Sequence, residues 1–219
     1  MFLSDKCFPP HYVIYLCLIG AGFLAGLARY NQKKAVQPVI ILLGLTFFSE
    51  FLSKVLACEI KNNSIVYHFY HPIQAALWGV FFYINMRSIL RRTVIPLSIL
   101  LLASSILNTI FLQNTDIFPG NFVKLECIVL LFWSFCLFFE FIDKPISDSI
   151  FNDSRFIICI AVIWFNLVSY LFFVLFNYYV TQPKPVFSIR GIHYFSNYTY
   201  YSLLLLAMFL KCNHRANDR

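Results

Sequence analysis

Residues 156–181 read FIICIAVIWFNLVSYLFFVLFNYYVT, a run of 26 residues that contains no charged side chain. A helix needs about 20 predominantly apolar residues to cross the hydrocarbon core of a bilayer. A β-strand at the same place would leave its backbone edges without hydrogen-bond partners in lipid. The run therefore predicts a membrane-spanning helix and an all-α fold.

Six further runs of similar length and character lie on either side of it. The seven predicted spans cover 12–30, 38–58, 65–86, 94–113, 122–142, 156–181 and 191–212. The connectors between them are short and polar, and none is long enough to fold by itself. We therefore expect residues 1–219 to form a single seven-transmembrane-helix bundle, a polytopic membrane protein without a soluble domain.

The composition agrees with lipid as the solvent. Hydrophobic residues make up 60% of the chain and charged residues 12%, whereas a soluble domain carries about 25% charged residues. The formal charge of +7 is spread over separate connectors and does not gather on one face. This spread argues against nucleic acid as a partner and directs attention to membrane orientation.

The basic residues of the connectors divide unevenly between the two sides of the predicted bundle. One side has eleven: Arg29, Lys33, Lys34, Arg87, Arg91, Arg92, Lys144, Arg155, Lys211, Arg215 and Arg219. The other side has four: Lys6, Lys61, Lys184 and Arg190. Because basic connectors stay in the cytosol, the bias predicts an outer N-terminus and a cytosolic C-terminus. An outer belt of tyrosines agrees with it: Tyr67, Tyr70, Tyr178, Tyr179, Tyr194 and Tyr198.

The seven cysteines include no CxxC pair. Cys7, Cys58 and Cys127 fall near the outer ends of predicted spans. An oxidising outer compartment would allow a disulfide between two of these three, and the pairing is left open.

Several polar residues fall inside the predicted spans, and most of them sit at one depth. An ionisable group at the centre of a membrane helix costs about 2.5–3.5 kcal/mol on insertion scales, so such groups usually face the bundle interior. Counting about 1.5 Å of rise per residue, these side chains gather in the outer half. The candidate pocket residues are Glu50, Lys54, His68, His71, Gln74, Asn108, Glu126, His193 and Asn197.

The shared depth supports two interpretations. In the functional one, these residues line a polar pocket that opens outward. In the structural one, Glu50 and Lys54, four residues apart on one helical face, neutralise each other. The histidines and amides then only hold the helices together by hydrogen bonds.

A metal site is an alternative interpretation of the same residues. His68, His71 and His193, with Glu50 or Glu126, could supply three nitrogens and a carboxylate to zinc. A zinc-bound water could then attack a lipid ester or amide. Seven-helix intramembrane hydrolases of the ceramidase and adiponectin-receptor type use three histidines and an aspartate. Their last helix carries two histidines four apart, whereas this chain has His193 followed by Asn197.

The stretch SEFLSKVLACEIKNNSIVYHFYHPIQAALW at residues 49–78 resembles a group of uncharacterised bacterial seven-helix inner-membrane proteins. Their second helix carries a glutamate, the following loop an asparagine pair and the third helix a YHxYxPIE-like motif. The matching positions are Glu50, Asn62, Asn63, Tyr67, His68, Tyr70, Pro72 and Ile73. Gln74 stands where those proteins often have glutamate. The regions around Glu126 and around His193 and Asn197 resemble their fifth and seventh helices.

The resemblance implies a seven-helix fold in the cytoplasmic (inner) membrane of a bacterium and supplies no mechanism. We expect a receptor-like binding module, sensory or accessory, whose outward pocket binds a small ligand or a partner helix and which has no resident cofactor. With short cytosolic connectors, it would signal through a separate membrane or cytosolic protein. A zinc-dependent intramembrane hydrolase is the first alternative, and a small-solute transporter is the second.

Overall fold

The computed structural model describes residues 7–143, 150–180 and 187–212. Several of the basic residues that predict the orientation lie outside these ranges, namely Lys6, Lys144, Lys184, Arg215 and Arg219.

Seven long helices make up almost all of the described chain. They are α1 (Pro10–Leu27), α2 (Gln37–Glu59), α3 (Ser64–Asn85), α4 (Ser88–Leu107), α5 (Gly120–Asp143), α6 (Ser154–Val180) and α7 (Phe187–Phe209). Short 3-10 turns connect them, and α4 continues into a π-helical turn, Asn108–Leu112. The described residues contain no β-strand beyond a single bridge between Asp153 and Lys211. The expected all-α fold is confirmed.

Each helix overlaps one of the predicted spans, and the fourth differs most. Helix α4 begins at Ser88 and not at residue 94. Both carboxylate oxygens of Glu140 on α5 accept a hydrogen bond from the Arg87 amide, each at 3.1 Å. A carboxylate at this place favours an early start of the helix, because the first amides of a helix lack partners within it.

Five helical segments in the described part are long and apolar enough to cross a membrane. They are Pro10–Leu27, Lys34–Glu59, Ile89–Leu112, Gly120–Asp143 and Ser154–Leu175. Helices α3 and α7 are of similar length, 22 and 23 residues, but carry more polar side chains. For these two helices, crossing the membrane remains a prediction.

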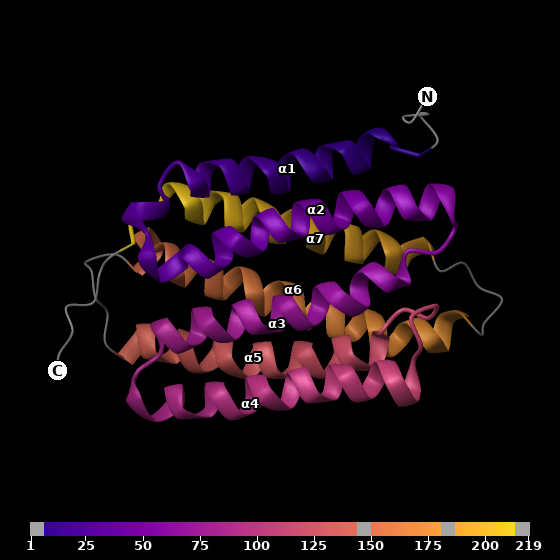
Figure 1. Ribbon diagram of the computed structural model, residues 1–219. Helices are drawn as coiled ribbons and strands as arrows, with labels where there is room; N and C mark the ends of the chain where they lie inside the picture. The colour runs from indigo at the N-terminus through magenta and orange to yellow at the C-terminus, as the bar shows by residue number, and fades with distance from the viewer. Residues whose placement is uncertain (1–6, 144–149, 181–186, 213–219) are drawn as a thin grey trace.

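The helices run side by side with alternating direction, and consecutive helices are neighbours (Figure 1). Helix α7 returns to pack against α1, so the seven helices close a ring. The starts of α1, α3, α5 and α7 lie at one end of the bundle, on the right in Figure 1, which we call the Pro10 end. The opposite end, which carries the α1–α2 connection, is called the Lys33 end.

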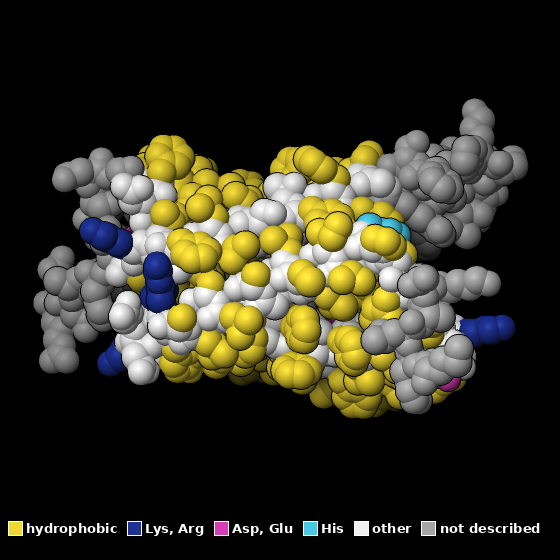
Figure 2. All heavy atoms as spheres, turned by 90° about the horizontal axis from the view of Figure 1, so that it is seen from above, with side chains coloured by type: hydrophobic (Ala, Val, Ile, Leu, Met, Phe, Trp, Pro, Cys, Tyr) yellow, Lys and Arg dark blue, Asp and Glu magenta, His cyan; other side chains and the backbone are white. Residues whose placement is uncertain are grey.

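Apolar side chains cover the long sides of the bundle, as Figure 2 shows for one face. On that face the lysine and arginine side chains lie near the two ends, most of them at the Lys33 end. Large apolar residues such as Phe48, Ile89 and Phe111 are 66%, 78% and 73% exposed. A water-soluble surface rarely carries such a continuous apolar cover, whereas lipid tails accept it.

The half of the bundle toward the Lys33 end is packed solid around aromatic side chains of α3 and α5. Trp78 on α3 and Trp133 on α5 are fully buried, and Phe82 contacts both rings at centroid distances of 6.0 and 5.6 Å. Tilted and edge-on aromatic pairs of this kind are favourable beyond the area that they bury. This cluster closes the centre of the bundle from about the level of Trp78 onward.

At the Lys33 end, a buried lysine joins the connector between α1 and α2 to the end of α7. The Lys33 ammonium donates hydrogen bonds to the carbonyls of Ala207, Met208 and Leu210, at 2.9, 3.0 and 2.6 Å. These are terminal carbonyls of α7, which lack partners within their own helix and attract a positive charge. Burial lowers the pKa of Lys33 to about 8, so the amine is mostly charged at neutral pH.

Candidate ligand-binding cavity

A cavity of about 800 Å³ lies inside the ring of helices at the Pro10 end. Helices α1, α2, α3, α5, α6 and α7 all contribute side chains to its wall, together with the segment that follows α4. Cavities that hold small organic ligands usually measure about 300–1,000 Å³. The cavity is therefore large enough for a ligand of ordinary drug size.

Most of the polar residues predicted for a pocket reach this cavity. Seven of the nine line it: Glu50, Lys54, His71, Gln74, Glu126, His193 and Asn197. They come from α2, α3, α5 and α7, helices that are far apart in the chain. Because α7 packs against α1, His193 and Asn197 on α7 reach the same cavity as the residues of α2, α3 and α5.

Helix α3 presents its polar face to the cavity through a regular spacing. Tyr67, Tyr70, His71 and Gln74 all line the wall, and they follow one another at intervals of three, one and three residues. This spacing places them on one face of an α-helix. The cavity wall is thus a continuous stripe of α3 and not a set of isolated polar residues.

His71 on α3 pairs with Glu126 on α5. The Nδ1 atom of His71 lies 3.0 Å from Oε2 of Glu126. Glu126 is only 2% exposed, and its second oxygen, Oε1, has no hydrogen-bond partner. Leaving a buried acceptor without a partner costs about 1–3 kcal/mol, and more for a charged group. Oε1 of Glu126 is therefore a buried acceptor whose hydrogen bond is not satisfied by the described residues.

Glu50 does not pair with Lys54, contrary to the structural interpretation of the sequence. The hydroxyl of Tyr12 on α1 donates to the backbone carbonyl of Glu50 at 2.8 Å and to the carboxylate of the same residue at 3.1 Å. The Lys54 ammonium lies instead over the Tyr12 ring, 5.1 Å from its centroid. A tyrosine from another helix has thus replaced the expected ion-pair partner.

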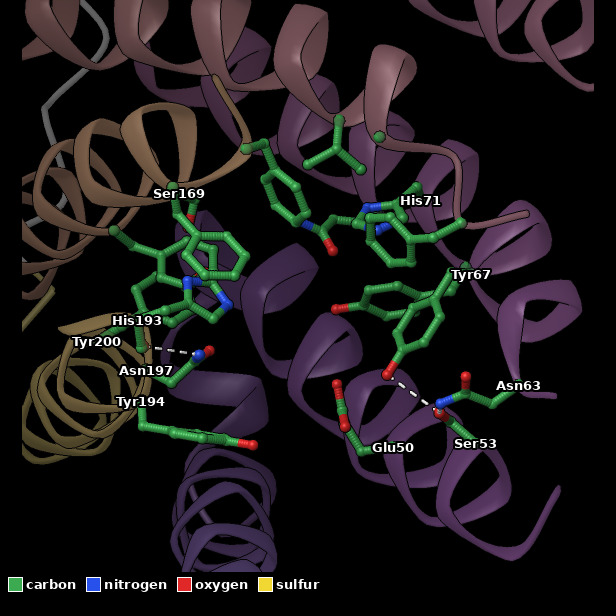
Figure 3. Close-up of a pocket in the computed structure, with 18 of the residues that line it drawn as sticks. Glu50, Ser53, Asn63, Tyr67, His71, Ser169, His193, Tyr194, Asn197 and Tyr200 are labelled. Atoms are coloured by element: carbon green, nitrogen blue, oxygen red, sulfur yellow. Dashed lines mark hydrogen bonds between the residues drawn. The ribbon is translucent and has the colours of Figure 1, made fainter. Parts of the chain in front are cut away.

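The wall opposite α2 and α3 comes from α6 and α7, and Figure 3 shows the open space between the two walls. His193 stacks on Phe172 with ring centroids 4.4 Å apart. Its Nδ1 atom and the Oγ of Ser169 are buried without hydrogen-bond partners. Asn197 donates to the carbonyl of His193 at 3.0 Å, within its own helix (Figure 3).

A chain of hydrogen bonds positions the cavity wall that α2 and α3 form. Asn63 donates to Oγ of Ser53 at 2.7 Å, and Ser53 donates to the Tyr67 hydroxyl at 3.0 Å (Figure 3). Asn62 accepts a hydrogen bond from the Ser64 amide at 3.0 Å, where α3 begins. The asparagine pair thus sets the turn between α2 and α3 and so orients Tyr67.

Two of the nine predicted residues do not belong to the cavity lining. His68 is buried between the Thr109 hydroxyl and the Ile117 carbonyl, each 2.8 Å from one of its ring nitrogens. Asn108 is buried at the start of the π-helical turn after α4. His68 therefore joins α3 to the segment after α4 and does not line the cavity.

The alternative zinc ligands are not brought together. His68 points to the segment after α4, Glu50 is bonded to Tyr12, and His193 is stacked on Phe172. Among the described residues, no three histidine, cysteine or acidic side chains lie close enough to hold a metal ion. The set His68, His71, His193 and Glu50 is corrected accordingly: only His71 has an acidic neighbour, and that neighbour is Glu126.

Much of the cavity wall is aromatic, and this part was not predicted from the sequence. Tyr67, Tyr70, Tyr194 and Tyr198 line the cavity, although they are predicted as an interfacial belt. The signal was present in the spacing: Tyr194, Asn197, Tyr198 and Tyr201 repeat the pattern of the α3 stripe. Tyr12, Tyr15, Phe118, Phe172 and Phe173 also line the cavity and could not be singled out in a chain with 26 phenylalanines and 13 tyrosines.

A disulfide lies beside the cavity at the Pro10 end. It joins Cys7, just before α1, to Cys58 near the end of α2, and the two Cα atoms are 5.9 Å apart. Cys127 remains a free, buried thiol in the cavity wall. Of the pairings that the sequence left open, the structure selects Cys7–Cys58. This bond holds Pro9 and His11 against the cavity, which both residues line.

Fold and cavity together define an all-helical protein with five helices able to cross a membrane and a polar and aromatic cavity. Comparison with protein-family models finds no match. Comparisons with curated proteins and with solved structures find none either.

Proposed function

We propose that the chain is a seven-span inner-membrane protein whose cavity opens to the outside and binds a small ligand without transforming it. The Pro10 end is the outer end in this proposal, and the Lys33 end is cytosolic. The uneven division of basic residues supports this orientation, because the Lys33 end carries Arg29, Lys34, Arg87, Arg91 and Arg92. The Cys7–Cys58 disulfide supports it as well, since disulfides persist on the oxidising side of a bacterial membrane.

The observation that carries the binding proposal is a set of buried polar atoms without partners. Glu126 Oε1, His193 Nδ1 and Ser169 Oγ come from three helices and all belong to residues that line the cavity. Unpaired buried polar atoms also occur away from the cavity, on Trp133 and Ser134 for example, but among the described residues only these three belong to side chains that line it. A ligand in the cavity would supply the missing hydrogen bonds.

The structure supports a zinc hydrolase and a small-solute transporter less well. A zinc hydrolase needs ligands that converge, and both ring nitrogens of His68 are engaged by Thr109 and Ile117. A transporter needs a path through the bundle, and Trp78, Phe82 and Trp133 fill the centre below the cavity. We therefore favour a binding module, which would pass its signal to a separate membrane or cytosolic protein.

The test is chemical access to the cavity. Ser169→Cys would be made in a background without the native free cysteines and exposed to a positively charged, membrane-impermeant methanethiosulfonate from outside the cell. We expect modification of this cysteine. Ser134→Cys is the matched control, because Ser134 is a fully buried serine on α5 outside the cavity lining and should stay unmodified.

Two results would contradict the proposal. Modification of Ser169→Cys only in inverted membrane vesicles would reverse the orientation. Equal protection of both cysteines from both sides would show that the cavity does not open to either surface.

A further inference from the structure

The cavity carries two carboxylates that no strong base neutralises. Glu50 is bonded to a tyrosine hydroxyl, and Glu126 is bonded to a histidine. Lys54 and Lys124 also line the cavity, but neither ammonium lies within 4.0 Å of a carboxylate oxygen. In the low-dielectric interior of a membrane protein, such carboxylates attract a positively charged group strongly.

Aromatic rings from four helices line the same cavity as these carboxylates. Tyr12 and Tyr15 come from α1, Tyr67 from α3, Phe172 from α6 and Tyr194 from α7, and all of them line the cavity. The faces of such rings carry partial negative charge and attract ammonium groups that lie within about 6 Å of the ring centroid.

One corner of the cavity already holds an ammonium group in this way. The Lys54 ammonium lies 5.1 Å from the Tyr12 ring centroid, and the hydroxyl of the same ring is bonded to Glu50. The ring face of Tyr12 thus already holds a cation that belongs to the protein. Glu126, elsewhere in the wall of the same cavity, keeps its Oε1 without a partner.

An anionic ligand fits the cavity less well. No arginine is among the described residues that line it, although arginine is the side chain that best matches carboxylate and phosphate groups. An anion would also have to approach Glu50 and Glu126 in a poorly solvated space.

From this arrangement we propose that the ligand is an organic cation, with an ammonium group directed to Glu126 and Glu50 and an apolar body against the aromatic wall. The inference rests on the proposed binding function and names its ligand class. The ammonium would donate a hydrogen bond to Glu126 Oε1 or, if it is quaternary, lie against the carboxylate and the neighbouring ring faces.

The experiment uses purified full-length protein in lipid nanodiscs and isothermal titration calorimetry. The probes are benzyltrimethylammonium, choline, the uncharged choline isostere 3,3-dimethylbutan-1-ol and the anion benzenesulfonate. We expect both cations to bind. We expect the uncharged isostere to bind at least about tenfold more weakly than choline, because it keeps the shape and loses the charge; tenfold corresponds to about 1.4 kcal/mol.

Isosteric variants locate the binding. Glu126→Gln and Glu50→Gln should each weaken benzyltrimethylammonium binding by about tenfold. Glu59→Gln is the matched control, because Glu59 lies exposed on the same helix as Glu50 and does not line the cavity. Tyr194 lies at the exposed rim, so its replacement should not disturb folding. Tyr194→Leu should weaken cation binding, and Tyr194→Phe should preserve it.

The outcomes separate this inference from the proposed function. Equal binding of choline and its uncharged isostere, tighter binding of benzenesulfonate, or no binding of either cation would each overturn the organic-cation inference. The access of an external reagent to Ser169→Cys would still support an outward cavity in all three cases. Cation binding that survives both glutamate variants would also overturn the inference, because the carboxylates would then play no part.

Discussion

The half of the bundle near the Lys33 end and the half near the Pro10 end are built from the same helices but packed differently. Near the Lys33 end, the rings of Trp78, Phe82 and Trp133 fill the centre of the bundle. Near the Pro10 end, the same α3 and α5 present His71 and Glu126 to an open cavity. The comparison teaches that one helix can fill the centre in one half and border a cavity in the other, because the side chains on its inward face change along its length.

The largest expected effect concerns which end of the bundle lies outside the cytoplasm. An alkaline phosphatase fused after Asn62, in the connector at the Pro10 end, should be active. The same enzyme fused after Lys34 or Arg92, at the Lys33 end, should be inactive, because the phosphatase folds only outside the cytoplasm. Activity would be measured in intact cells at matched expression levels. An active fusion at Arg92 would remove the basis for an outward cavity.

The next largest effect should distinguish a packing residue from a cavity residue. Trp133→Ala removes a fully buried ring from the closed half and should cost about 3–5 kcal/mol of stability. Tyr194→Ala removes a ring that is 55% exposed at the cavity rim and should change stability by less than about 0.5 kcal/mol. Thermal unfolding in a mild detergent would compare them. Equal losses of stability would mean that the buried ring of Trp133 contributes no more to folding than the exposed ring of Tyr194.

A smaller effect is expected at the Lys33 end itself. Lys33→Met leaves three terminal carbonyls of α7 without their donor and should cost about 1–3 kcal/mol. Lys34→Met is the matched control, because Lys34 is the next residue and is exposed. If both variants unfold at the same temperature, the lysine does not anchor α7.

The smallest loss of stability should come from substitution of Lys54. If Lys54 neutralised a buried Glu50, removal of the lysine would cost about 3–5 kcal/mol of stability. The structure places its ammonium over the Tyr12 ring instead, so Lys54→Met should cost only about 0.5–1 kcal/mol. Tyr12→Phe, which removes the hydrogen bond to Glu50, should cost as much or more. A loss above about 3 kcal/mol for Lys54→Met would restore the ion-pair interpretation.

The sequence predicted the polar residues of α3 better than those of α4. Tyr67, Tyr70, His71 and Gln74 repeat at helical spacing, so a common face could be recognised from the chain alone. His68 lies between them in sequence but on another face, and only its bonds to Thr109 and Ile117 show this. A count of depth along the helix does not specify which way a side chain points.

The two glutamates teach the same lesson about partners. Four-residue spacing made Lys54 the natural partner of Glu50, yet Tyr12 from a neighbouring helix is the group that bonds to it. No pattern within α2 could reveal this, because the partner lies 38 residues away. The pairing of His71 with Glu126 was likewise beyond the reach of local spacing, since 55 residues separate them.

The sequence by itself determined the all-helical fold, the apolar runs able to cross a membrane, and the level at which polar residues collect. These properties depend on composition and spacing within about 20 residues, the length that a bilayer selects. Only the tertiary structure decided which side chains meet: the contact of α7 with α1, the bond between Tyr12 and Glu50, and the exclusion of His68 from the cavity. Such contacts depend on how each helix is rotated about its axis, and that rotation is set by packing against neighbours far away in the chain.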